Sequence, residues 1–309
     1  MSKVLGILLS LLITLSCNNI KQEEEVEIIE IIEYKEIIND NYELNKPVRN
    51  ANAVLVLFGG FPEQPKDIKR EFQIQEIAKK NNIAVLYMNY NQKLWINKSD
   101  KPHLEELLKL IFDDNKLPTD NIYIGGFSSG GNVTLLLSNY LKSISSSIQP
   151  KGVFIIDSPV DLLELYRLAK RNIARNFSKL SIHEANWLIK LFENEFENSE
   201  NGIKKYEEFS PYTAETKNIQ NLLSLKGLKI RFYSEPDTIW WEEKRKNKPT
   251  DLNAFWIEKL TIILKSKFSH SSVEYIPTKN RGYRSNGERH PHSWSIVDKK
   301  DLVEWMIKK

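Results

Sequence analysis

The chain has 309 residues, of which 41% are hydrophobic and 28% charged, with 12 glycines and 12 prolines. This composition excludes collagen-like, disulfide-scaffold and wholly disordered proteins, and the length suits one large domain or two small ones. The 44 basic and 41 acidic side chains almost balance, at a formal net charge of +3, and they are evenly scattered. We therefore expect no nucleic-acid partner.

The chain begins with an apolar run over residues 4–15, preceded by Lys3. Because this run is too short to cross about 30 Å of hydrocarbon as a helix, it predicts a cleavable signal peptide over residues 1–16. Cys17 follows directly and is the only cysteine, so no intramolecular disulfide can form.

The run Ile-Thr-Leu-Ser-Cys at residues 13–17 resembles the lipobox of bacterial lipoprotein signal peptides, although Thr14 stands where that family usually has Leu. The resemblance implies that Cys17 becomes the acylated first residue of the mature protein. It also implies a lipid-anchored membrane protein of the bacterial cell envelope. The alternative is a buried free cysteine behind an ordinary signal peptide.

The segment over residues 17–44 is expected to hold the lipidated cysteine, a tether and the lead into the domain. Residues 18–25 are polar and acidic, which is typical of a tether. Residues 26–38 combine β-branched side chains with glutamates three residues apart, so helix and strand both remain open and a strand is favoured.

From residue 45 to residue 309, buried-type strands alternate with amphipathic helices. The expected strands cover residues 53–58, 83–90, 122–124, 152–156, 228–233 and 272–276, and helices are expected over 66–81, 103–112, 130–141 and 299–308. This alternation predicts an α/β fold with a doubly wound, mostly parallel sheet. Between about 159 and 225 the apolar spacing is helical, and its length predicts a helical lid insertion.

One motif directly follows the strand expected at 122–124. Gly126-Phe127-Ser128-Ser129-Gly130 has the G-x-S-x-G pattern between a strand and a helix, where a sharp turn exposes a serine hydroxyl. The start of the helix offers amide donors to a developing oxyanion. This context predicts Ser128 as a nucleophile.

Residues 45–309 resemble the α/β-hydrolase family in this motif and in the run Phe-Gly-Gly-Phe-Pro-Glu at 58–63. The resemblance implies an oxyanion hole with one amide from Ser129 and a second from Phe61 or Gly60. Gly59 stands where the family usually has a histidine, so the usual side-chain buttress of this loop is missing.

The resemblance also implies a chain order of serine, acid and histidine. Asp237 follows the strand expected at 228–233 and is our predicted acid, with Glu235 and Glu242 as alternatives. For the base we prefer His292 to His290, because Trp294 can pack beside His292 and a proline restricts the backbone of His290. The predicted triad is Ser128, Asp237 and His292.

Other features of the C-terminal half point less clearly to a function. The His-x-His pair has no third ligand cluster, so we expect no metal, and the glycine-rich stretches lack a P-loop lysine, so we expect no cofactor. Trp240, Trp241 and Trp256 suit sugar platforms or, preferably, buried packing. Arg281, Arg284 and Arg289 could pair with an anionic substrate group, but a solvated basic loop is favoured.

The sequence therefore predicts an exported serine hydrolase that cleaves a small-molecule or glycan ester through an acyl-enzyme intermediate. A peptidase or amidase, or an acyltransferase, would use the same triad. A non-catalytic binding or scaffold lipoprotein is the alternative from another class, because the fold alone does not determine the function.

Overall fold

The computed structural model describes residues 33–90, 93–196, 198–268 and 272–308. The predicted signal peptide, Cys17 and most of the tether lie outside the described residues. Within the described ranges, no helix is long and apolar enough to cross a membrane.

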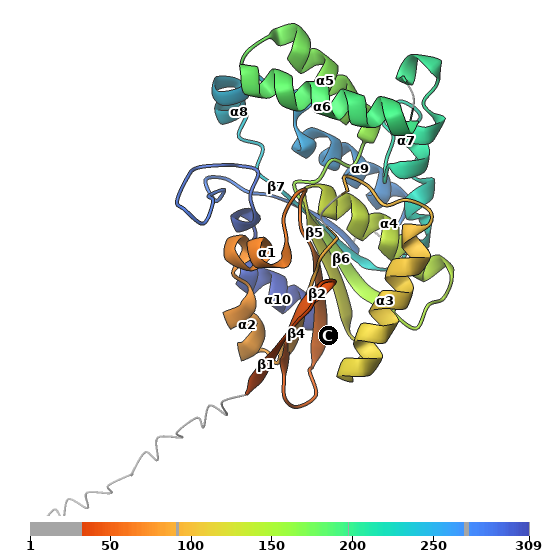
Figure 1. Cartoon of the computed structure of the whole chain (residues 1–309), viewed down its shortest axis with the longest axis vertical. Helices are drawn as coiled ribbons and strands as arrows, with labels where there is room; N and C mark the ends of the chain where they lie inside the picture. Colours follow the sequence, from red (N-terminus) through yellow and green to blue (C-terminus); the bar gives the residue numbers. More distant parts are fainter. Residues whose placement is uncertain (1–32, 91–92, 197, 269–271, 309) are drawn as a thin grey trace, which may run out of the picture. The chain divides into compact units, whose positions relative to one another are not determined.

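A sheet of eight strands forms the centre of the described chain, in the order β1-β2-β4-β3-β5-β6-β7-β8 (Figure 1). β1 pairs antiparallel with β2 and β2 with β4, whereas all other neighbours are parallel. This order confirms the predicted doubly wound, mostly parallel sheet. The strands are β1 (Tyr34–Ile38), β2 (Tyr42–Pro47), β3 (Ala53–Phe58), β4 (Ile83–Met88), β5 (Ile122–Phe127), β6 (Pro150–Ile156), β7 (Lys229–Ser234) and β8 (Val273–Pro277).

The sheet begins earlier than the predicted domain boundary at residue 45. β1 lies in the segment that we expected to be a tether and a lead, β2 begins in it, and both strands belong to one compact unit with the rest of the described domain. β2 pairs with β4 in a register that places Tyr42 opposite Met88, and its Tyr42 and Leu44 side chains are buried. The preferred strand within residues 26–38 is confirmed for β1, and residues 26–32 lie outside the described part.

Helices cover both faces of the sheet because the central strands are apolar on both sides. In β3, alternate residues pack against helices of opposite faces. One face carries α1 (Pro65–Phe72), α2 (Gln75–Lys80) and α10 (Lys299–Ile307); the other carries α3 (Asp100–Asn115), α4 (Ser129–Ser143) and α9 (Asn253–Lys267).

Two helical features differ from the sequence prediction. The single helix expected over residues 66–81 is divided, because Gln73 has a left-handed backbone (φ 50°) that ends α1 before α2 begins. Two further helices, α8 (Thr238–Arg245) and α9, follow β7 and were not predicted from the sequence.

Helices occupy the predicted insertion between β6 and β7: α5 (Leu162–Arg175), α6 (Lys179–Phe196), η1 (Ser199–Asn201), α7 (Lys204–Phe209) and η2 (Gln220–Leu225). An aromatic and aliphatic cluster packs α5, α6 and α7 together. By contrast, η2 packs against α4, where the Asn139 side chain accepts the Ser224 N–H at 2.9 Å. Its packing therefore assigns η2 to the helical layer of the sheet.

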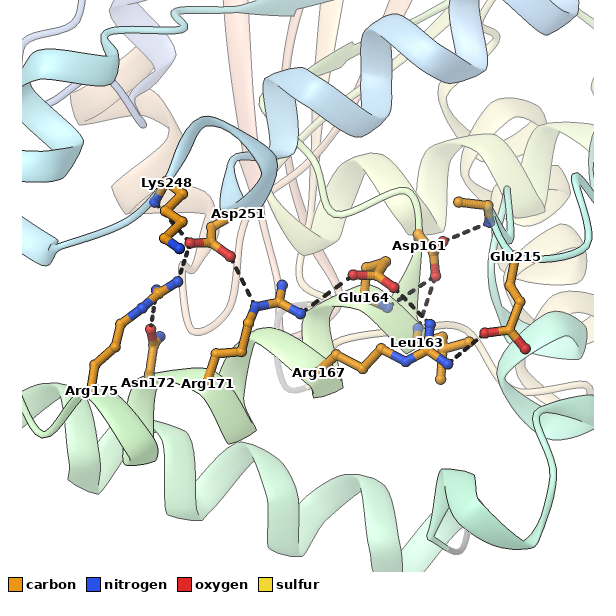
Figure 2. Close-up of polar contacts among 11 residues, drawn as sticks. Asp161, Leu163, Glu164, Arg167, Arg171, Asn172, Arg175, Glu215, Lys248 and Asp251 are labelled. Carbon is orange, nitrogen blue, oxygen red and sulfur yellow. Dashed lines mark hydrogen bonds and ion pairs between the residues drawn. The ribbon is translucent and has the colours of Figure 1, made fainter.

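Ion pairs connect α5 to the short helix η3 (Pro249–Asp251), which precedes α9 (Figure 2). The Asp251 carboxylate accepts hydrogen bonds from Arg171, at 3.0 Å, and from Arg175. It also accepts the Lys248 N–H at 2.8 Å, and its side chain is only 2% exposed. A buried carboxylate therefore holds α5 over the end of the sheet.

Candidate active site

Ser128 lies in a sharp turn between β5 and α4, with φ 52° and ψ −127°. A Cβ on Gly126 would lie 2.2 Å from the Gly130 carbonyl oxygen, and one on Gly130 would lie 2.3 Å from the Phe58 oxygen, so both positions require glycine. The Ser128 N–H donates to the Ile156 carbonyl oxygen at 2.9 Å, which fixes the turn against β6. The structure thus shows the strained strand-to-helix turn that the motif predicts.

His292 lies in the loop between β8 and α10. Its Nδ1 is 2.6 Å from Asp157 Oδ2, and its ring packs at 4.5 Å from the ring of Phe127, the residue before Ser128. Both His292 and Ser128 line one cavity. With Nδ1–H donating to the carboxylate, Nε2 is the nitrogen free to accept a proton.

The carboxylate partner of His292 is Asp157, so the prediction of Asp237 for this position is wrong. Asp157 directly follows β6, and its N–H donates to the Tyr233 carbonyl oxygen at 2.8 Å. Its side chain is only 8% exposed. An aspartate directly after a buried parallel strand was a usable signal in the sequence, because polar groups at that edge of a sheet face the ligand crevice.

Asp237 and Glu235 instead stabilise the loop that carries the histidine, through ion pairs and hydrogen bonds. Asp237 caps α8 by accepting the Trp240 N–H at 3.1 Å, and it pairs with Arg289 at 2.6 Å. The buried Glu235 also pairs with Arg289, and it accepts the backbone N–H groups of Arg281 and Gly282 at 2.8 and 3.0 Å. Because the Arg289 cation holds both carboxylates, neither orients His292.

Glu242, the remaining alternative for the acid, is exposed on α8. Nothing in the described contacts links it to His292.

The loop after β3 lies against the nucleophile turn. A Cβ on Gly60 would lie 2.9 Å from Ser128 Cβ, so only glycine allows this approach. The Phe61 N–H donates to Ser129 Oγ at 2.8 Å, whereas the Gly60 N–H donates to Glu63 Oε2 at 2.8 Å. Of the two amides that the sequence left open, Phe61 thus faces the nucleophile turn and Gly60 is engaged elsewhere.

Glu63 supports this loop in place of the side chain that Gly59 lacks. Its carboxylate accepts the Gly60 N–H and also the Trp294 indole N–H, at 3.1 Å. Burial raises the pKa of Glu63. Glu63 is thus a residue of the site that was not predicted from the sequence, although it belongs to the run at 58–63 that resembles the family.

A cavity of about 640 Å³ connects these groups to the helical insertion. Ser128, Asp157 and His292 line one part of it. Leucines of α5 and α6 line another part, and the Phe61 ring stacks on Trp187 of α6 at 5.2 Å. The cavity thus offers an apolar surface beside the serine, with a size suited to a small organic ligand.

His290 occupies a different environment from His292. The rings of Trp240 and Trp241 pack edge-on against it at 4.9 and 6.0 Å. Both tryptophans are only partly buried, and Trp241 also lines the cavity, so the choice between packing and a ligand platform stays open for Trp241. Burial lowers the pKa of His290 to about 3, so its ring is neutral near pH 7. Within the described residues, no group of three or more potential ligands could hold a metal ion.

The sequence matches no protein-family model and no curated protein. Similar solved structures include carboxyl esterase 2 from Tuber melanosporum, at 15% identity and a TM-score of 0.55 over 89% of this chain and 86% of that one. A fluorophosphonate-binding serine hydrolase of Staphylococcus aureus is 14% identical, with a TM-score of 0.50 over 90% and 98% of the two chains. An acylaminoacyl peptidase of Pyrococcus horikoshii is 14% identical, with a TM-score of 0.52 over 91% of this chain and 42% of that one. The chain has the α/β-hydrolase fold.

In this α/β-hydrolase fold, neighbouring parallel strands bring the site residues together. Ser128 follows β5 and Asp157 follows β6, and the two strands pair in a register that places Phe127 opposite Ile156. His292 arrives from the loop after β8. The carboxyl edge of the sheet therefore assembles groups that lie more than 160 residues apart in the sequence.

Proposed function

We propose that this protein is a serine hydrolase that cleaves an ester through an acyl-enzyme intermediate. The observation that carries the proposal is the Asp157–His292 hydrogen bond, beside a strained Ser128 in one cavity. An acid, an imidazole and a serine hydroxyl in this arrangement are the groups that nucleophilic acyl transfer needs.

In the proposed reaction, Ser128 Oγ attacks the ester carbonyl while His292 Nε2 takes the hydroxyl proton. Asp157 holds the imidazole in the required tautomer and stabilises the imidazolium. The backbone N–H groups of Ser129 and Phe61 bind the oxyanion, and for this the Phe61 N–H leaves Ser129 Oγ. His292 then returns the proton to the departing alcohol, and a water molecule hydrolyses the acyl-enzyme by the reverse sequence of proton transfers.

Labelling with a fluorophosphonate probe tests this proposal. We expect the wild type to be labelled, and Ser128→Ala to abolish labelling while its circular dichroism spectrum stays unchanged. Ser143→Ala, at the exposed end of the same helix, is the matched control and should be labelled like the wild type. Labelling that survives Ser128→Ala would place the nucleophile elsewhere.

The substrate class in this proposal is a small-molecule or glycan ester, and turnover of 4-nitrophenyl esters tests it. A peptidase, an amidase or an acyltransferase would use the same groups, and the esterases and the peptidase among the similar structures show that the fold accommodates both chemistries. Ligand binding without labelling or turnover would instead favour a non-catalytic binding lipoprotein.

We also propose that the protein is exported and anchored in the cell envelope through an acylated Cys17. The support is the apolar run and the lipobox-like segment at residues 13–17. In bacterial expression, the full chain should partition into the detergent phase and Cys17→Ala should not. Identical fractionation of both forms would contradict acylation at this residue.

A further inference from the structure

Three arginines, Arg70, Arg245 and Arg284, line the cavity that contains the proposed nucleophile. Arg70 lies 2.7 Å from an Asp67 carboxylate oxygen, and Arg245 lies 3.5 Å from Glu184. In the part of the chain that the structure describes, Arg284 forms no ion pair. Its guanidinium therefore has no carboxylate of the described residues within ion-pair distance.

The loop between β8 and α10 shows the same contrast. Arg281 pairs with Asp298 at 3.2 Å, and Arg289 pairs with Asp237 at 2.6 Å. Arg281 and residues 285–288 are exposed, in agreement with the solvated basic loop favoured from sequence, whereas Arg289 is partly buried between two carboxylates. Arg284 differs from both, because it lines the cavity without contacting a carboxylate of the described chain.

The backbone at Arg284 is held in place by its neighbours. The N–H and hydroxyl of Ser285 donate to Glu71 of α1 at 2.9 and 2.7 Å. The Arg284 N–H donates to the Glu288 carbonyl oxygen at 2.8 Å, and the Gly287 N–H donates to the Arg284 oxygen at 2.9 Å. A loop whose backbone is already ordered loses less conformational entropy when one of its side chains binds a ligand.

Glu63 is the cavity carboxylate that could compete for Arg284. It has no cation within ion-pair distance in the described residues, and its oxygens accept hydrogen bonds from Trp294 and Gly60. Burial raises the pKa of Glu63 and the Arg284 charge opposes this rise, so the two groups interact through space without direct contact. Glu63 therefore leaves the guanidinium available to a ligand.

We propose that the Arg284 guanidinium binds a carboxylate of the substrate, so that the preferred substrates are esters that carry a carboxylate besides the ester bond. The inference rests on the proposed hydrolase function and names its substrate class. A guanidinium presents two parallel N–H groups that match a carboxylate, and such charge-assisted pairs are strong when water is partly excluded. Arg284 is half-buried, which meets that condition.

A matched pair of substrates tests the inference on the acyl side. The monoester of glutarate with 4-nitrophenol carries a terminal carboxylate, and 4-nitrophenyl valerate has the same chain length without it. We expect Arg284→Gln to lower the ratio of kcat/KM for the anionic ester to that for the neutral ester by about tenfold or more. Arg281→Gln removes the same charge from the same loop and should leave this ratio unchanged.

A second pair places the carboxylate on the alcohol side, as the acetate esters of 4-hydroxyphenylacetic acid and of its methyl ester. If Arg284→Gln lowers the ratio of kcat/KM for the anionic to the neutral ester in either pair, the inference is supported. The pair that shows this effect identifies the side of the ester on which the arginine lies. If Arg284→Gln lowers kcat/KM equally for all four esters, or leaves both ratios of kcat/KM unchanged, Arg284 does not recognise the substrate carboxylate and the inference is wrong.

Binding to the Ser128→Ala protein separates this inference from the proposed hydrolysis, because it requires no turnover. Calorimetry should show tighter binding of the glutarate monoester than of the valerate ester, and the added Arg284→Gln change should remove that difference. Equal binding of both esters would contradict the inference even if the wild type is an esterase. Selective anion binding in a wild type that hydrolyses neither ester would instead contradict the proposed function.

Discussion

Asp157 and His292 form a 2.6 Å hydrogen bond, and the carboxylate comes from the strand directly beside the one that carries Ser128. The Ser128 N–H donates to the carbonyl oxygen of Ile156, the residue directly before Asp157 in the chain. This short connection through adjacent backbones couples the orientation of the imidazole to the position of the serine.

The first prediction follows from this pairing. Asp157→Asn should lower kcat for ester hydrolysis by about 10³- to 10⁴-fold, the order observed for the orienting aspartate of serine proteases, because the amide favours the wrong tautomer of His292. Asp237→Asn is the control with the same chemical change, and it should cost less than about tenfold. Steady-state kinetics check both variants, and a reversed order of the two effects would restore Asp237 as the acid.

The second prediction concerns pH and His290. Its folded-state pKa is lowered to about 3 and its unfolded value is about 6.5, so between these values the unfolded chain binds a proton that the folded protein does not. The wild type should therefore lose stability as pH falls from about 6.5 towards 3. His290→Gln should reduce this loss, measured as the difference in Tm between pH 7 and pH 4.5.

The exposed His183 provides the control for this experiment, since His183→Gln should leave the acid loss of stability unchanged. The decline of ester turnover at acid pH should persist in His290→Gln, because the proton acceptor in our proposal is His292. A decline that disappears in this variant would make His290 the base.

The third prediction concerns the support of the oxyanion loop. Glu63→Ala removes the acceptor of the Gly60 and Trp294 N–H groups, so the Phe61 amide should lose its fixed position. We expect kcat to fall by about 10²-fold, as when an oxyanion donor is lost, with a smaller change in KM.

Glu63→Gln tests whether an acceptor oxygen alone supports the loop. Because burial already raises the pKa of Glu63, a neutral amide should be tolerated at this position and should restore most of the activity. Equal losses in both variants would show that the charge of Glu63 matters and its acceptor role does not.

The fourth prediction concerns the attachment of α5 to the body of the domain (Figure 2). Asp251→Asn should lower the free energy of unfolding by about 3 kcal/mol, because the charge of a buried carboxylate that serves Arg171 and Arg175 is lost. Urea denaturation measures this change. The pair of Lys170 and Glu200 is exposed and 3.4 Å long, so Glu200→Gln should change stability by less than about 0.5 kcal/mol.

The sequence by itself determined the type of fold and the position of the nucleophile turn. A strand that is apolar at every position, such as residues 53–58, is typical of a parallel sheet covered by helices on both faces. Such a run of adjacent apolar residues is a local pattern, so it can be recognised in the sequence. The turn at Ser128 is likewise local, since two glycines around a serine between a strand and a helix allow few other structures. The insertion of helices after β6 follows from the same local periodicity.

Only the tertiary structure decided which side chains meet. Three carboxylates follow strands at this edge of the sheet: Asp157, Glu235 and Asp237. Neither their residue type nor their position after a strand shows which of them contacts the histidine. Arg289 neutralises the last two, and this leaves Asp157 for His292. Likewise, the sequence does not distinguish the three loop arginines, Arg281, Arg284 and Arg289, because their roles depend on their ion-pair partners. Long-range pairing depends on strand order and loop path, which a linear pattern does not encode residue by residue.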